Sequence, residues 1–392
     1  MARPIPVAER RARLARRHRL VDEARAGSAA EVAGSLVGLH GTDPASVYVA
    51  AAVRMRSATI DAIAAELYEA RSLVRMLAMR RTMWVFPIEL AAIAQAAATD
   101  AVAQNERRKL EKMLVDAGVA AEAGAWLELA ERETLRALAL RGEATGAELS
   151  ADVPQLREQF RFGIGTKWEG VQTATTRLLL LLAAEGKIVR ARPRGSWISS
   201  QYRWTPLESW LPGGFPQWDL EAAQTELVLR WLYAFGPATI EDVKWWTGWT
   251  LGSTRRALAA VEAVEVDLDG AAGLVLPHDV EPVEALEPWA ALLPALDPTA
   301  MGWLRRNWYL GEHAPALFDR SGNVGPTVWW DGRTVGGWGQ RPDGEVVYRL
   351  LEDVGAEAAA AIGDAADSVT AFVGGTRVTP RFRTPLEREL SA

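Results

Sequence analysis

The sequence has 392 residues, enough for roughly two to four domains and a sizeable hydrophobic core. Of these residues, 49% are hydrophobic and 24% are charged, which excludes a disordered or fibrous chain and is typical of a folded globular protein. The net charge of −6 argues against a uniformly basic nucleic-acid binder. Local charge must therefore decide whether any surface suits an anionic partner.

The chemistry open to this chain is narrowed further by what it lacks. Cysteine is absent, which excludes disulfides, thiol nucleophiles and cysteine-ligated zinc. The four histidines lie far apart in sequence, so we expect neither a metal nor another cofactor. The longest apolar runs, such as 178–184, are far shorter than the roughly 20 residues of a membrane span. The first 20 residues lack the apolar stretch of a secretion signal, so we expect a cytoplasmic protein.

Those first 20 residues are strongly basic, with seven arginines and one glutamate. A helix with a solvated charged face explains this pattern as well as a helix that contacts phosphates does. Both interpretations stay open for the N-terminal segment.

One helical signature occurs three times along the chain. Residues 135–149 match residues 229–243 at a constant offset of 94, and both contain paired leucines, a glycine and an Ala-Thr pair. A shorter copy at 58–63 matches 238–243 at an offset of 180. In every copy a threonine, followed by an acidic residue, stands where it can cap the N-terminus of the next helix; the three are Thr59, Thr145 and Thr239. This pattern predicts the start of a helix-turn-helix in each copy.

A β-hairpin is predicted after the helices of each copy. The strand pairs expected from apolar and β-branched residues are 73–77 with 82–86, 187–192 with 197–204, and 264–268 with 273–277. Helices that end in a hairpin are typical of a winged helix. The expected domains are therefore three winged-helix units at 1–115, 116–205 and 218–280, joined by Pro- and Gly-rich linkers.

The remaining segment, 281–392, is rich in predicted strands. Strands are expected at 327–330, 333–340 and 345–350, with Asp-Gly turns between them. A helix near 352–362 and a last strand near 368–373 complete the prediction. Taken together, the sequence predicts an α+β protein with three tandem winged helix-turn-helix units and a C-terminal antiparallel sheet or small barrel.

Basic residues gather on two of the three hairpins, whereas the third hairpin is acidic. Arginine on a hairpin beside a helix-turn-helix suits contact with DNA phosphates, because the guanidinium group binds phosphate through two parallel hydrogen bonds. The candidate DNA-binding residues are Arg71, Arg75, Arg80 and Arg81 on the first hairpin and Lys187, Arg190, Arg192 and Arg194 on the second. The acidic third hairpin is expected to face away from DNA.

A candidate site for chemistry lies at Leu39-His40-Gly41-Thr42-Asp43-Pro44. It brings an imidazole, a hydroxyl and a carboxylate together between two apolar segments. A purely structural interpretation is also open, because Asp43 followed by Pro44 is a common way to begin a helix. The pattern alone favours the capping role.

These stretches resemble the AlkZ and YcaQ superfamily of bacterial winged-helix DNA glycosylases. The matching segments are 36–44, 73–83, 323–332 and 343–348, which together span nearly the whole chain. The resemblance implies that tandem winged helices surround a concave DNA channel. It also implies removal of N7-alkylated purines, including bulky adducts and interstrand crosslinks, without a cofactor. Characterised members carry Gln-x-Gln or Gln-x-Asp where this chain has His40-Gly41-Thr42.

The function expected from this resemblance is that of a monofunctional DNA glycosylase, with His40, Thr42 and Asp43 as its catalytic residues. Hydrolysis of an N-glycosidic bond passes through an oxocarbenium-like sugar, which needs a nearby negative group and a held water. Asp43 would orient or deprotonate that water, His40 would bind the water or a phosphate, and Thr42 would complete the network. Double-stranded DNA with alkylated bases is the expected partner, and the protein is expected to act as a monomer.

Two other functions stay open from the sequence. A non-catalytic DNA-binding protein, such as a regulator or a damage sensor, would use the His40–Asp43 segment only as a helix junction. Alternatively, the winged helices would mediate protein contacts, with the acidic surface keeping DNA away. The missing glutamines favour the first alternative, whereas the carboxylate of Asp43 favours the glycosylase.

Overall fold

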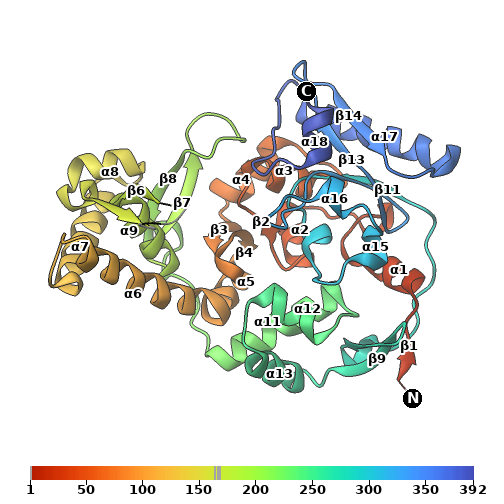
Figure 1. The fold of residues 1–392 in the computed structure, drawn as a ribbon, viewed down its shortest axis with the longest axis horizontal. Coiled ribbons are helices and arrows are strands. Elements are labelled where there is room, and N and C mark those ends of the chain that lie inside the picture. The colour runs from red at the N-terminus through yellow and green to blue at the C-terminus, as the bar shows by residue number, and fades with distance from the viewer. Residues whose placement is uncertain (1, 163–164, 166–168) are drawn as a thin grey trace.

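The computed structural model describes residues 2–162, 165 and 169–392. It confirms an α+β fold, with many helices and several small, mainly antiparallel sheets (Figure 1). Two lobes are visible in Figure 1: residues from about the middle of α6 to β8 form the smaller one at the left, and the rest of the chain forms the larger one.

The first helical unit is the one that carries the candidate site. It consists of α2 (Ala29–Ser35), β2 (Leu39–His40), α3 (Pro44–Ala52), α4 (Ile60–Tyr68), β3 (Leu73–Leu77) and β4 (Met83–Pro87). The predicted hairpin is present as β3 and β4, and β2 adds a third strand to give the antiparallel order β2-β4-β3. His40 lies opposite Trp84 in this sheet. The candidate site is therefore joined to the first hairpin by strand pairing.

The second unit forms the smaller lobe and has a hydrophobic core of its own. Two helices, α5 (Ile88–Ala94) and α6 (Asp100–Asp116), lead into it from the first unit. The lobe contains α7 (Ala123–Arg141), α8 (Gly146–Asp152), β5 (Gln159–Phe162), β6 (Gly170–Thr173), α9 (Ala174–Ala184), β7 (Ile188–Pro193) and β8 (Tyr202–Pro206). The predicted hairpin is β7–β8, whereas the β5–β6 hairpin between α8 and α9 was not expected.

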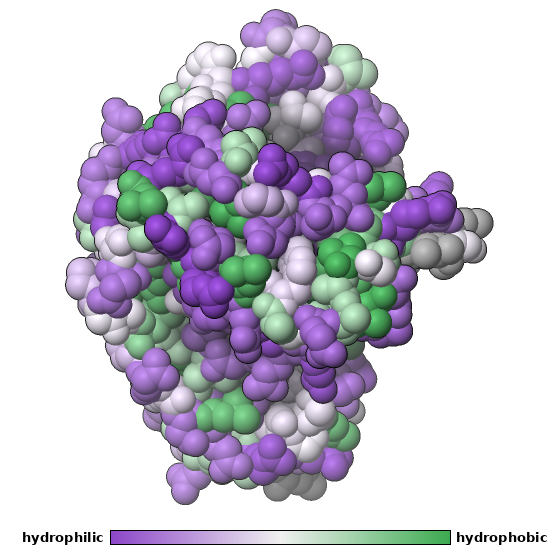
Figure 2. Space-filling view, turned by 90° about the vertical axis from the view of Figure 1, so that its left-hand side faces the viewer, coloured by the Kyte–Doolittle hydropathy of each residue, from purple (hydrophilic) through white to green (hydrophobic). Residues whose placement is uncertain are grey.

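The outer face of this lobe is polar. The side that Figure 2 turns towards the viewer is mostly hydrophilic, and its apolar side chains are scattered among polar ones. Among the exposed apolar residues of the lobe are Leu140 on α7 and Val171 on β6. Single exposed apolar side chains of this kind are normal for a folded protein.

The third unit incorporates the N-terminus of the chain. It contains α10 (Leu207–Trp210), α11 (Leu220–Phe235), α12 (Ile240–Thr247), α13 (Leu251–Ala260), β9 (Val264–Leu268) and β10 (Ala271–Val275). The short strand β1 (Arg3–Pro4) pairs in parallel with β9, and α1 (Val7–Arg17) packs against α11. The acidic third hairpin is thus one strand wider than its sequence indicated, because an edge strand offers unpaired backbone groups that a distant segment can fill.

The C-terminal region is built on a four-stranded antiparallel sheet in the order β11-β12-β13-β14. Its elements are β11 (Ala290–Leu293), α14 (Pro298–Met301), α15 (Asn307–Leu310), α16 (Ala314–Leu317), β12 (Thr327–Trp330), β13 (Arg333–Gln340), β14 (Val346–Leu350), α17 (Gly355–Val373) and α18 (Pro385–Leu390). The three strands predicted after residue 326 are all present.

One prediction for this region is wrong. Residues 368–373 were expected to form a strand but are the last turns of α17, which runs from Gly355 to Val373. The buried residues of the helix are Ala358, Ile362, Ala366, Val369 and Val373. They recur every three or four positions, and this helical spacing against the sheet outweighs the strand preference of the valines and threonine.

The predicted helix caps are confirmed in all three units. The hydroxyl of Thr59 accepts a hydrogen bond from Ala62 N at 3.1 Å at the start of α4. Thr145 and Thr239 form complete capping boxes, with Glu148 and Asp242 respectively returning a bond to the cap backbone. Each such cap stabilises its helix by about 1 kcal/mol, so the repeated threonine has the same local role each time.

Buried polar contacts join α1 and the first unit to the third unit and the C-terminal region. Arg54 and Asp297 are completely buried and form an ion pair, with Arg54 Nη2 2.7 Å from Asp297 Oδ1. Burial holds the pKa of His18 well below its usual value, and its ring packs between Phe235 and Trp303. These contacts fix the larger lobe as one packed body.

Candidate active site and DNA interface

The segment His40–Asp43 connects β2 to α3, and a tight backbone turn precedes it. Gly38 has a φ of +102°, and a Cβ at this position would lie 2.4 Å from Cε1 of Phe86, so only glycine fits. After the turn, Gly41 N donates to Met83 O at 2.7 Å, which continues the strand pairing past His40. The loop is therefore held against β4 on both sides of the imidazole.

His40 is buried and uncharged. Its side chain packs against Trp84, with ring centroids 5.3 Å apart. Burial lowers the pKa of His40 to about 3, with a smaller contribution from the positive charge of Arg80. No hydrogen-bond partner is present for Nδ1 within the described chain. At neutral pH the ring is thus a neutral donor or acceptor with one buried nitrogen available to a ligand or a water.

Asp43 caps α3, as the structural interpretation predicted. Its Oδ1 accepts from Ala45 N at 3.1 Å, and its Oδ2 accepts from Arg381 N at 3.0 Å. Burial raises the pKa of Asp43, while the hydrogen bonds from Arg381, Ala45 and Ser46 and the charge of Arg75 oppose that rise. A carboxylate has about four lone-pair sites, so about one remains after the bonds from Arg381, Ala45 and Ser46.

Thr42 lies between the imidazole and this carboxylate in sequence. Its Oγ1 is buried and finds no partner among the described residues. Buried polar atoms normally have a partner, and an exception marks a place for a water, an ion or a ligand. The loop therefore presents two unsatisfied polar atoms beside one partly satisfied carboxylate.

Arg75 supports this loop from the neighbouring strand β3. The sequence predicted a phosphate contact, but the residue is only 3% exposed and its Nη1 donates to the carbonyl oxygen of Gly41. Its guanidinium group also lies over the ring of Tyr202, 5.0 Å from the centroid. The bond to Gly41 places Arg75 to position the loop, and its contact with a phosphate stays a prediction.

The second hairpin supplies side chains to the same site. Tyr202 begins β8, and its buried hydroxyl has no partner among the described residues. Arg190 of β7 stacks on Tyr202 and Trp204 at 5.0 and 5.3 Å, and burial lowers its pKa to about 10. Sequence reasoning missed Tyr202 and Arg381 because nothing near them in sequence marks their approach to Asp43.

The other predicted DNA-binding residues of the second hairpin already have acidic partners. Arg192 pairs with Glu69 and Arg194 pairs with Glu148. The Nζ of Lys187 lies 2.9 Å from Glu131 and 2.8 Å from Glu185. Binding a phosphate through these groups requires an ion pair to open first.

The remaining arginines of the first hairpin differ from one another. Arg71 donates to the carbonyl oxygens of Ser209 and Trp210, and Arg81 pairs with Glu106 at 2.9 Å. Arg80 stacks on Trp245 at 4.0 Å and has no carboxylate partner among the described residues. Burial lowers the pKa of Arg80 to about 10, helped by the charge of Arg306. Arg71, Arg75 and Arg80 all lack an acidic partner among the described residues, but Arg71 and Arg75 are bonded to backbone carbonyls, which leaves Arg80 as the half-buried cation with neither kind of partner.

Comparison with known proteins identifies the family to which this chain belongs. The family model described as DNA glycosylase AlkZ-like matches residues 33–372, a range that includes the candidate loop and both basic hairpins. The chain belongs to the AlkZ-like DNA glycosylase family. No curated protein matches the sequence.

A solved structure of an AlkZ-like protein shows the same fold. Streptomyces sahachiroi DNA glycosylase AlkZ aligns with a TM-score of 0.73 at 21% sequence identity. The alignment covers 96% of this chain and 99% of that one. The overall architecture is therefore shared along nearly the full length of both proteins.

The described residues offer no ready metal site. Within ranges 2–162, 165 and 169–392, no three His, Asp or Glu side chains are grouped so that they could hold a metal ion. None of the helices in these ranges is both long and apolar enough to cross a membrane.

Proposed function

We propose that this protein is a monofunctional DNA glycosylase that hydrolyses the N-glycosidic bond of N7-alkylated or crosslinked purines in duplex DNA. Membership of the AlkZ-like family supports the reaction class. The observation that carries the proposal is the group of unsatisfied polar atoms beside a buried carboxylate, formed by His40, Thr42 and Asp43.

The reaction makes a limited demand on the protein. A cationic N7-alkylated base is already a good leaving group, so the enzyme must mainly stabilise positive charge on the sugar and hold a water. A carboxylate whose pKa is raised by burial is a stronger base than an exposed one, and Asp43 has this property. The remaining lone pair of Asp43 would orient the water, and the negative charge would offset the charge that develops on the sugar.

His40 and Thr42 would complete the water site as neutral groups. The imidazole has a pKa of about 3, so it cannot serve as a general acid at neutral pH. Its Nδ1 and the Oγ1 of Thr42 are instead suited to hydrogen bonds with the water or the sugar. In this chain they would take the place of the glutamines found in characterised members.

The three helix-and-hairpin units would act as winged helices around a concave DNA channel, within the boundaries 1–115, 116–205 and 218–280. Each unit has capped helices followed by an antiparallel pair of strands, which supports this assignment. Arg80 and Arg190 are the candidate DNA contacts with the strongest support, because among the described residues neither forms an ion pair with a carboxylate or a side-chain hydrogen bond to a backbone carbonyl.

A second function remains a candidate because of one specific observation. Both oxygens of Asp43 already accept backbone hydrogen bonds, which by itself accounts for a buried aspartate at a helix start. In that case the protein would bind DNA as a regulator or damage sensor without cleaving any bond.

The experiment that separates these functions uses duplexes carrying N7-methylguanine or a nitrogen-mustard crosslink, with abasic sites scored after alkali. Asp43→Asn keeps a capping side chain but removes the charge, and we expect it to lower the excision rate by about 100-fold or more. Asp219→Asn is the matched control, because Asp219 caps α11 in the same way on an exposed surface.

Excision by the wild type and by Asp219→Asn, but not by Asp43→Asn, would support the glycosylase. If the wild type binds these duplexes but releases no alkylated base, the non-catalytic function is correct instead.

A further inference from the structure

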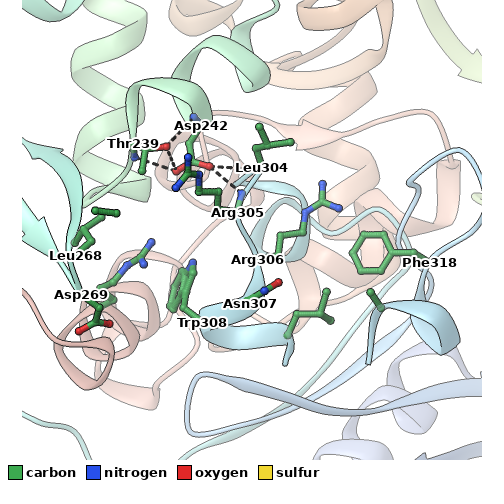
Figure 3. A pocket seen from close by; sticks show the side chains of 14 residues that line it. Thr239, Asp242, Leu268, Asp269, Leu304, Arg305, Arg306, Asn307, Trp308 and Phe318 are labelled. Atoms are coloured by element: carbon green, nitrogen blue, oxygen red, sulfur yellow. Dashed lines mark hydrogen bonds between the residues drawn. The ribbon is translucent and has the colours of Figure 1, made fainter. Parts of the chain in front are cut away.

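A second concave site lies apart from the candidate catalytic loop. It is a cavity of about 570 Å³ between α12, the β9–β10 hairpin and the segment that contains α15 and α16 (Figure 3). Neither His40, Thr42 nor Asp43 lines it. Figure 3 shows Arg306 and Phe318 on one side of the cavity and Asp269 on the other, with Trp308 and Asn307 between them.

Three arginines from two distant segments line this cavity: Arg10 of α1, and Arg305 and Arg306 just before α15. Within the part of the chain that the structure describes, none of the three forms an ion pair with a carboxylate. Arg192 and Arg194 of the second hairpin, by contrast, each have a glutamate partner. Arginines that converge on a cavity without acidic partners are typical of a site for an anion.

Stacking holds two of these guanidinium groups in place. Arg10 lies over the ring of Trp308, 4.1 Å from its centroid, and Arg306 lies over Trp245 and Phe318 at 5.0 and 4.8 Å. Arg306 Nε also donates to the carbonyl oxygen of Trp303 at 2.8 Å. Because the groups are positioned before any ligand arrives, less conformational entropy is lost on binding.

The two carboxylates at the cavity do not neutralise these arginines directly. Asp242 is occupied by backbone and hydroxyl donors: its Oδ1 accepts from Leu304 N and Arg305 N, and its Oδ2 accepts from Thr239. Asp269 occupies the turn of the β9–β10 hairpin. Three positive charges therefore face two negative ones, of which one is already held by four hydrogen bonds.

Trp308, which lines the cavity, also carries a buried donor that has no partner among the described residues. Trp308 Nε1 is buried and unsatisfied among the described residues, as is Arg10 Nε. An indole N–H can only donate a hydrogen bond, so an acceptor such as a phosphate oxygen is what this group lacks.

The cavity is connected to the candidate catalytic loop through one tryptophan. Arg306, which lines the cavity, and Arg80, whose charge lowers the pKa of His40, both stack on Trp245. A line of arginines without acidic partners thus runs from the region of His40 to the cavity.

We propose that the cavity lined by Arg10, Arg305 and Arg306 binds a backbone phosphate of the DNA strand that flanks the lesion. The phosphate chemistry follows from the cavity itself, and only its assignment to DNA rests on the proposed function. The third unit would then contact DNA through this cavity, of which its acidic hairpin forms one wall.

The test measures binding of an undamaged duplex by fluorescence anisotropy between 50 and 200 mM salt, so that excision plays no part. We expect Arg305→Gln and Arg306→Gln each to weaken binding and to reduce the slope of log K against log salt by about 0.9 for each phosphate that is no longer neutralised. Trp308→Phe, which keeps an aromatic ring but removes the N–H donor, should weaken binding with little change in slope.

The matched control is Arg341→Gln, because Arg341 is an exposed arginine paired with Glu345 on the C-terminal sheet. Arg306→Lys is a second control: it keeps the positive charge, so it should retain most of the salt slope that Arg306→Gln loses. Calorimetric titration of inorganic phosphate into the wild type and Arg305→Gln forms the second arm.

An unchanged salt slope in both Gln variants overturns the proposal. If phosphate binding is abolished in Arg305→Gln while duplex binding is unchanged, the site takes a free phosphate and the DNA assignment is overturned. If the slope falls as expected but no alkylated base is released, this inference stands and the proposed glycosylase function fails.

Discussion

The arginines of the second hairpin and those around Trp245 are the same residue type in different electrostatic settings. Arg192 and Arg194 are exposed and paired with glutamates, whereas Arg80 and Arg306 stack on Trp245 and have no acidic partner among the described residues. An exposed ion pair contributes about 0 to 1 kcal/mol, and it must open before the arginine can bind a phosphate. Availability to DNA therefore depends on the partner of each arginine more than on its position on a hairpin.

The largest effect is expected at the buried pair Arg54–Asp297, where removal of the acidic partner should affect the stability of the fold. Replacing Asp297 with alanine should lower the free energy of unfolding by about 3 to 5 kcal/mol, because it leaves a completely buried charge without a partner. Urea denaturation followed by far-UV circular dichroism measures this change. The double variant Arg54→Met with Asp297→Leu should recover much of the loss, and equal destabilisation by the single and double variants would contradict the argument.

A second test concerns the neutral state of the buried His40 ring and its effect on the pH dependence of stability. The folded-state pKa of His40 is lowered from 6.5 to about 3, so its contribution to stability is present above pH 6.5 and is lost as the pH falls towards 3. The slope should reach about 1.4 kcal/mol per pH unit for this one group. Asp43 acts in the opposite direction, because its raised pKa favours the folded state at lower pH.

The measurement for His40 is a series of urea midpoints between pH 7 and pH 4 for the wild type and His40→Gln. The variant should show a shallower loss of stability with acid. His278→Gln is the control, because His278 lies on the surface side of the third unit. Parallel curves for the wild type and His40→Gln would show that His40 is not held neutral by the fold.

A third test separates positioning from phosphate contact at Arg75. Arg75→Met should slow base excision by about tenfold or more, since the loop loses the hydrogen bond to the carbonyl of Gly41, while duplex affinity stays unchanged. Arg71→Met is the matched control, because Arg71 also binds backbone carbonyls but at α10. Single-turnover excision and anisotropy give the two readouts. A parallel loss of affinity and rate in Arg75→Met would restore the phosphate contact that the sequence suggested.

The smallest effect is expected for Arg192, and it tests directly whether an arginine with a glutamate partner contributes less to DNA binding than one without. Arg192→Gln should leave the salt slope of duplex binding nearly unchanged and alter stability by less than about 0.5 kcal/mol. Arg80→Gln should reduce that slope by about 0.9. If Arg192→Gln has the larger effect on the slope, its pair with Glu69 opens readily on DNA and the comparison is wrong.

Local features of the fold could be predicted because they depend on nearby residues. The threonine caps, the three hairpins and the last three strands of the C-terminal sheet follow from spacing and turn chemistry, and they appear within a few residues of the predicted positions. The strand β11 was not predicted, because its Pro-rich surroundings were interpreted as a linker, and the return strand of the second hairpin begins at Tyr202 and not at residue 197. The strand predicted at 368–373 is wrong because β-branched content was given more weight than helical spacing. The pairing of β1 with β9 depends on contacts more than 260 residues apart, which no local pattern encodes.

In the candidate site, too, the sequence predicted what neighbouring residues determine and missed what distant segments contribute. The sequence indicated His40, Thr42 and Asp43 because they are neighbours, and it offered both a capping and a catalytic role for Asp43. It could not show that Arg75 is buried beneath the loop or that Tyr202 and Arg381 approach it. Nor could it distinguish arginines with glutamate partners from arginines without them, since that depends on which segments meet in space.

The Arg54–Asp297 pair also bears on how the chain acquires its structure during synthesis. The partners are separated by 243 residues, so Arg54 does not meet its buried carboxylate until about three quarters of the protein has been made. The small lobe, whose core is built from residues 110–188, can fold as soon as it leaves the ribosome. The larger lobe completes its packing later, and the apolar face of α1 stays uncovered until α11 has been made, which exposes this part of the nascent chain to chaperones and aggregation.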